Sequence, residues 1–127
     1  MSREALLAPS APAPAGPYSQ AIVSNGFVFT AGVLPRDAAS GEVPETVGEQ
    51  TRLVLHNIRE ILRHAGAELD DVIKCTVHLQ NPKRDAAEFN AVYAEAFAAP
   101  YPVRTTVGSE LNNVLVEIDV VAALPAR

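Results

Sequence analysis

Residues 102–120 read PVRTTVGSELNNVLVEIDV, two β-prone runs on either side of a polar turn. This stretch decides the fold, because two adjacent strands here commit the end of the chain to a sheet. Side chains alternate between the faces of a strand, and a turn centred near 110–111 would place Arg104 of the first run opposite Glu117 of the second. We therefore predict that Arg104 and Glu117 are neighbours on one face of the sheet.

Two interpretations of this charge pair stay open from the residues alone. The first is an ordinary cross-strand ion pair, since opposite charges commonly stabilise neighbouring strands. The second is a site in which Arg104 offers a planar fork to a substrate carboxylate and Glu117 transfers a proton or orients a water.

The segments before this stretch predict a hairpin, two helices and one more strand. Asn25-Gly26 between two β-prone runs is typical of a type I′ hairpin turn. The apolar spacing over 47–65, followed by Gly66, predicts a helix with a glycine cap. Residues 71–80 alternate and predict a half-buried strand, with Ile73, Cys75, Val77 and Leu79 on the buried face and His78 on the polar face.

A second helix is expected within 81–97, where Asp85 and Glu88 have the spacing of a capping box. The order β-β-α-β-α-β-β predicts an α+β fold, with both helices on one face of a mostly antiparallel sheet. We expect one domain over residues 1–127, and the prolines of residues 1–16 predict an extended N-terminal arm.

Composition narrows the function classes. The net charge is −5, with 10 Lys+Arg against 15 Asp+Glu, so a small metabolite or a protein is a better partner than nucleic acid. One cysteine and three scattered histidines show no metal-ligand spacing, so no metal is expected. No apolar run is long enough to span a membrane, and nothing resembles a signal peptide, so we expect a cytoplasmic protein.

Five motifs in the same order resemble the RidA family, also called YjgF/YER057c/UK114. They are GPYSQA (16–21), VFTAGVLPRDAASGEVP (28–44), FNAVYAEAF (89–97), YPVRTTV (101–107) and VEIDVVA (116–122). The resemblance implies a chorismate-mutase-like fold and a homotrimer with sites in the clefts between subunits. It also implies hydrolysis, without a cofactor, of reactive enamines and imines such as 2-aminoacrylate and 2-iminopropanoate to 2-keto acids and ammonia.

The same resemblance assigns roles to individual residues. Arg104 matches the arginine that grips the substrate carboxylate, and Glu117 matches the glutamate that handles water and protons. Tyr18 and Asn90 match two further residues that line the cleft. Gly32 matches a position where backbone approaches the ligand, which the absence of a Cβ allows.

Three positions depart from the pattern frequent in these deaminases. Ala31 replaces a serine, Val33 replaces a glutamine, and Thr106 replaces a cysteine but keeps a hydroxyl in the predicted substrate-binding set. These departures bear on substrate preference and rate. Two alternatives therefore remain open: a non-catalytic member that binds small carboxylates or a protein, and a pathway-specific deaminase for a larger substrate such as 2-aminomuconate. The residues do not decide whether solvent or Glu117 supplies the proton that an enamine needs at carbon.

Overall fold

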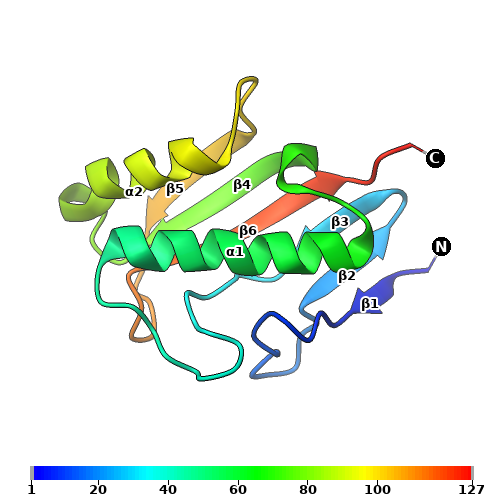
Figure 1. Ribbon diagram of the computed structural model, residues 1–127, viewed down its shortest axis with the longest axis horizontal. Helices are drawn as coiled ribbons and strands as arrows, with labels where there is room; N and C mark the ends of the chain where they lie inside the picture. Colours follow the sequence, from blue (N-terminus) through cyan, green and yellow to red (C-terminus); the bar gives the residue numbers. More distant parts are fainter. Residues whose placement is uncertain (1, 127) are drawn as a thin grey trace.

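The computed structural model describes residues 2–126 as one six-stranded mixed sheet carrying two helices (Figure 1). The strand order across the sheet is β1-β2-β3-β6-β4-β5. The elements are β1 (Glu4–Leu6), β2 (Ala21–Ser24), β3 (Phe27–Thr30), α1 (Val47–Ala65), the short 3-10 helix η1 (Leu69–Asp71), β4 (Val72–Leu79), α2 (Pro82–Ala96), β5 (Val103–Gly108) and β6 (Val116–Ala123).

The predicted hairpin at Asn25-Gly26 is confirmed. Both residues have positive φ, 53° at Asn25 and 79° at Gly26, as a type I′ turn requires. Ser24 and Phe27 face each other across the turn. The segment predicted as an extended arm also contributes β1, which pairs antiparallel with β2 at the edge of the sheet.

Helix α1 has the predicted bounds because both of its ends are capped. The Thr46 hydroxyl accepts a hydrogen bond from the Glu49 N–H at 3.1 Å and donates one to the Glu49 carboxylate at 2.9 Å. Gly66 ends the helix in the left-handed conformation, at φ 90°. Val54, Ile58 and other apolar residues of one stripe are fully buried against the sheet.

Helix α2 lies within the predicted range of 81–97, but it begins before Asp85. Asn81 is the N-cap residue and Pro82 opens the first turn, a position where a missing N–H costs nothing. The predicted capping box at Asp85 is therefore wrong. Glu88 instead accepts a hydrogen bond from the Gly48 N–H of α1 at 2.8 Å and joins the two helices.

Strand β4 has the predicted alternation except at its start. The β4–β6 register shifts between Val72 and Lys74, and this bulge buries Val72 and leaves Ile73 46% exposed. The prediction for Ile73 is therefore wrong. Cys75 is fully buried, as predicted.

The last two strands exist as predicted, but they do not pair with each other. Strand β5 pairs parallel with β4 on one side, and β6 pairs antiparallel with β4 on the other. The reason is that α2 crosses over the sheet between β4 and β5 and returns the chain in the same direction, as parallel neighbours require. The predicted hairpin of these two strands is wrong.

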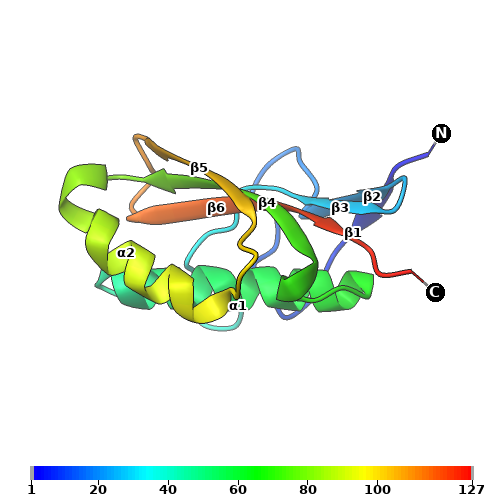
Figure 2. The ribbon, with the colours of Figure 1, turned by 90° about the horizontal axis from the view of Figure 1, so that it is seen from above.

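Both helices cover the same face of the sheet, which confirms the predicted α+β architecture (Figure 2). Alternate residues of β6, including Val116 and Ile118, are buried beneath the helices. The opposite face, here called the open face, carries no helix within residues 2–126 (Figure 2). Large apolar side chains are exposed on it, namely Phe27, Phe29, Val103 and Val107.

Candidate active site

Glu117 lies half-buried on the open face, where a bulge in β3 brings Gly32 against it. Phe29 pairs with Val121, whereas Val33 pairs with Ile118, so the β3 side holds one extra residue between these pairs. A Cβ added to Gly32 would lie 2.8 Å from the Cδ of Glu117. The absence of a side chain at Gly32 thus leaves the space that the Glu117 carboxylate occupies. Gly32 is required here for this space and not for a positive φ.

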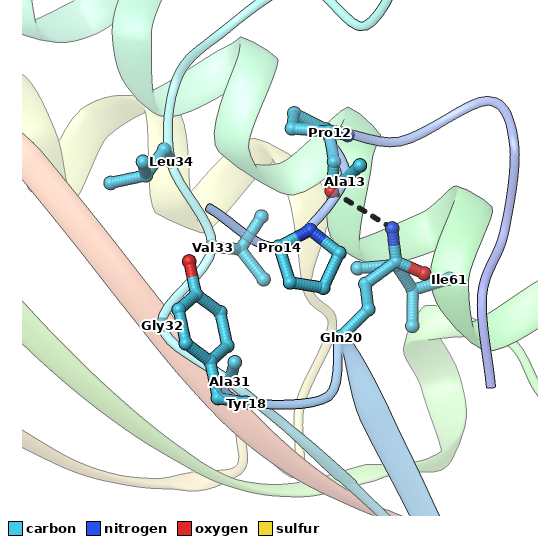
Figure 3. Close-up of a pocket in the computed structure, with 10 residues that line it drawn as sticks. All are labelled: Pro12, Ala13, Pro14, Tyr18, Gln20, Ala31, Gly32, Val33, Leu34 and Ile61. Carbon is cyan, nitrogen blue, oxygen red and sulfur yellow. Dashed lines mark hydrogen bonds between the residues drawn. The ribbon is translucent and has the colours of Figure 1, made fainter. Parts of the chain in front are cut away.

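Tyr18 joins this group from the N-terminal segment. Its ring lines a small cavity together with Ala31, Gly32 and Val33 (Figure 3). The cavity volume of about 30 Å³ is enough for one water molecule. The Tyr18 hydroxyl accepts a hydrogen bond from the Ala15 N–H at 3.2 Å.

Gln20 explains why the N-terminal segment stays in this position. Its buried side-chain oxygen accepts a hydrogen bond from the Ala8 N–H at 2.7 Å. Its amide nitrogen donates to the Pro12 carbonyl at 2.9 Å, the contact drawn in Figure 3. A buried, fully used amide of this kind fixes a proline-rich loop that has little regular structure of its own.

Arg104 lies on the edge strand β5, on the face that the helices cover. Its guanidinium carbon is 4.7 Å from the ring centre of Tyr93 and 5.5 Å from that of Phe89, both on α2. Such stacking orients the guanidinium while leaving its N–H edge available. Within residues 2–126 its side chain makes no hydrogen bond or ion pair.

The groups beneath Arg104 are neutral. Burial raises the pKa of the Tyr93 phenol and that of the Cys75 thiol, so both keep their protons near neutral pH. No neighbouring anion therefore offsets the arginine charge from below. The arrangement favours an external carboxylate as its partner.

Two other predicted site residues belong to the Arg104 side. Thr106 is exposed two residues along β5 and shares the face of Arg104. Asn90 is exposed on α2, directly after Phe89. The predicted residues therefore divide by element: Glu117, Gly32 and Tyr18 make one group, and Arg104 and Thr106 on β5 make the other, together with Asn90 of α2, the helix whose rings Arg104 stacks on.

These two groups are separated within one chain, so the predicted contact between Arg104 and Glu117 is wrong. Strand β4 lies between β5 and β6. Arg104 of β5 pairs with Cys75 of β4, whereas Glu117 of β6 pairs with His78 of β4, three residues further along. This offset amounts to about 10 Å along the strands and about 10 Å across them. The two side chains also leave opposite faces of the sheet.

The residues around His78 form a polar cluster that sequence reasoning did not assemble. The His78 Nδ1 lies 2.7 Å from the Ser109 hydroxyl, and its Nε2 lies 3.8 Å from the Asp119 carboxylate. Burial raises the pKa of the Asp119 carboxyl, although His78 and Lys74 act in the opposite direction. The alternation of β4 predicted that His78 lies on the polar face. Its two partners could not be predicted in this way, because Asp119 belongs to β6 and Ser109 directly follows β5.

Two searches of residues 2–126 found nothing. No group of three or more His, Cys, Asp or Glu side chains is arranged to hold a metal ion. None of the helices there is both long enough and apolar enough to cross a membrane.

Comparisons with known proteins agree over nearly the whole chain. A family model described as Endoribonuclease L-PSP matches residues 8–124. A RutC family protein of Pyrococcus horikoshii is 46% identical, over 94% of this chain and 97% of that protein. The chloroplastic Reactive Intermediate Deaminase A of Arabidopsis thaliana is 41% identical, over 98% of this chain and 67% of its own length.

Solved structures also match over nearly the whole chain. Yeast Mmf1 superimposes with a TM-score of 0.91 at 32% identity, covering 98% of this chain and all of that one. TdcF of E. coli, whose crystal structure contains bound serine, superimposes with a TM-score of 0.88 at 34% identity. That match covers 96% of this chain and 99% of TdcF.

Proposed function

The chain belongs to the Endoribonuclease L-PSP family, also called the YjgF/RidA family, and from this membership we propose that it hydrolyses reactive enamines and imines to 2-keto acids and ammonia. The observation that carries the proposal is the pair of groups described above. Such a reaction needs a carboxylate anchor and an acid or base, and the chain offers a half-buried glutamate and an arginine that is stacked on a ring and has no ion-pair partner within residues 2–126. The relative named as a reactive intermediate deaminase supports this reaction class.

Arg104 is the proposed anchor of the substrate carboxylate. Its two donor edges match the geometry of a carboxylate, and the stacked rings of Tyr93 and Phe89 hold the guanidinium in one orientation. The serine bound in TdcF supports a small carboxylate as the ligand class. An anchor of this kind holds the substrate in one orientation, so that water can attack its C=N carbon in the geometry that the reaction needs.

Glu117 is the proposed acid and base. Hydrolysis of an imine requires that water add to the C=N carbon and that the nitrogen gain protons until ammonia leaves, while the carbon keeps the oxygen as a ketone. Glu117 takes a proton from the attacking water and gives it to the nitrogen, which forms a carbinolamine. It then moves the proton of the new hydroxyl group to the same nitrogen, so ammonia leaves, the carbon becomes a ketone and no net proton is consumed. An enamine must first gain a proton at carbon, from solvent or from protonated Glu117. The proposed reaction uses no cofactor.

The complete site, in this proposal, forms between two copies of the chain. One chain separates Arg104 from Glu117 by the width of two strand spacings and by the thickness of the sheet. The open face offers exposed apolar residues, including Phe27, Phe29 and Val103, that a neighbouring copy would bury. We propose a homotrimer in which Arg104, Thr106 and Asn90 of one copy meet Glu117, Gly32 and Tyr18 of the next.

Thr106 and Ala31 set the proposed substrate preference. Thr106 supplies a hydroxyl two residues from the anchor, and Ala31 leaves an apolar methyl in the cavity beside Gly32. We therefore propose small 2-imino acids, of the 2-iminopropanoate and 2-iminobutanoate type, as substrates.

We also propose a cytoplasmic location, although a relative is named as chloroplastic.

The test is the release of ammonia and keto acid from 2-aminoacrylate made in situ by a dehydratase. We expect the protein to accelerate this release and Arg104→Ala to abolish most of the acceleration. Binding of small carboxylates without any acceleration would reject the enzyme and favour a non-catalytic binding protein. Acceleration with 2-aminomuconate alone would favour the pathway-specific deaminase.

A further inference from the structure

A groove of about 350 Å³ runs between α1 and α2, and none of its lining residues belongs to either group of the candidate active site. Its walls come from the two helices, and Leu69 of η1 lies at its side. The two helices cover the face of the sheet opposite to the open face (Figure 2). In the proposed trimer, where the open face is the one that packs against a neighbouring copy, this groove therefore stays exposed. Its volume lies within the range typical of small-molecule sites.

The α1 wall of the groove is basic. Arg52, His56 and Arg59 line it at spacings of four and three residues, so they share one side of the helix. The α2 wall contributes one acidic residue, Glu95, whose carboxylate lies 3.5 Å from the Arg52 guanidinium. One carboxylate therefore faces two guanidinium groups and an imidazole.

Glu95 forms its ion pair with Arg52, and the second arginine of the groove, Arg59, has no such partner within residues 2–126. Its Nε is buried, and it has no hydrogen-bond partner within residues 2–126. A buried donor without a partner is costly, and charged donors are the most costly. Because the Nε is enclosed, a ligand in the groove meets Arg59 through its terminal nitrogens, and a carboxylate bound there brings a counter-charge to the guanidinium.

The floor of the groove is apolar. Leu55 and Val92 are buried beneath it, and Leu69 and Ala96 complete its lining. A basic rim above an apolar floor is complementary to a ligand with one negative charge and a short hydrocarbon body. We propose that this groove binds a small carboxylate with an apolar body, held at Arg59 and shared at Arg52 with Glu95.

The test uses benzoate as the probe, with acetate and inorganic phosphate as separate arms. Binding is followed in the full-length protein by chemical shifts of the Leu55, Leu69 and Val92 methyl groups, with benzoate up to about 20 mM. We expect saturable shifts with benzoate, and much weaker ones with acetate, which lacks the apolar body. No methyl shifts with benzoate, or tighter binding of phosphate than of benzoate, would overturn the proposal.

Three variants separate the site from nonspecific charge effects. Arg59→Gln should weaken benzoate binding about tenfold, because the charged fork is lost. Glu95→Gln should tighten binding, because it frees Arg52. Arg63→Gln removes the same charge from α1 outside the groove, at a residue paired with Glu68 at 3.1 Å, and should leave binding unchanged. Equal weakening by Arg59→Gln and Arg63→Gln, or weaker binding by Glu95→Gln, would contradict the proposal.

Discussion

Substitution of Gly32 by alanine should disable Glu117 without unfolding the protein. The added Cβ would clash most closely with the Oε2 of Glu117, and it would lie 2.8 Å from the Cδ and 3.1 Å from the Cγ. Two carbon atoms in ordinary contact are about 3.5 Å apart, so the Cδ of Glu117, at 2.8 Å from the added Cβ, must move by about 0.7 Å. The backbone itself accepts alanine, since Gly32 is absent from the residues with positive φ.

The size of the effect follows from the sensitivity of catalysis to geometry. A displacement near 1 Å of a reacting group costs on the order of 100-fold in rate, so we expect kcat/KM to fall by about 10- to 100-fold. Stability should change little, because the group that moves is the end of a flexible side chain.

The assay is a double-mutant cycle on keto-acid release, with Gly32→Ala, Glu117→Gln and the double variant. If Gly32 acts through Glu117, alanine at position 32 should cost little once Glu117 is already glutamine. Thermal unfolding of each variant controls for loss of the fold. Full activity in Gly32→Ala, or losses that simply multiply in the double variant, would refute the reasoning.

Three further predictions concern Arg104, Cys75 and Asp119. Tyr93→Leu should raise KM about three- to tenfold by removing the ring beneath Arg104, whereas Tyr93→Phe should keep KM because it keeps that ring. Cys75 should resist a thiol reagent at pH 8 until the protein unfolds, because burial raises the pKa of its thiol; rapid labelling of folded protein would contradict this. Burial raises the pKa of the Asp119 carboxyl above its unfolded value of about 3.9, so its contribution to stability is lost as the pH rises from that value through the folded pKa. Asp119→Asn should therefore raise the thermal midpoint at pH 7 more than at pH 3, and an equal or opposite change would exclude this linkage.

The sequence predicted those parts of the fold that depend on local chemistry. The turn at Asn25-Gly26 and the cap at Gly66 need positive φ values that few other residues accept, so their positions can be read directly. The alternation of β4 likewise reports burial on one face. Helix α2 was harder, because Pro82 and Asp85 offer two competing starts and only packing against Gly48 distinguishes them.

Strand pairing could not be predicted in the same way, because it is a long-range property. Adjacent runs in sequence favour a hairpin, yet the crossover through α2 places β4 between β5 and β6. The residues of the candidate site were identified from motifs, but their grouping depends on this pairing. Arg104 and Glu117 therefore occupy different sides of one chain, and the bulge at Gly32 appears only in the three-dimensional register.

The most direct test of a deaminase site formed between copies is complementation between two inactive variants. Arg104→Ala and Glu117→Gln are co-expressed with different tags, and oligomers that carry both tags are purified. In a cyclic trimer of mixed chains, one interface of the three joins an intact Arg104 to an intact Glu117, so we predict about one third of the wild-type rate of keto-acid release. Mixed oligomers as inactive as the separate variants would contradict a site shared between neighbouring copies.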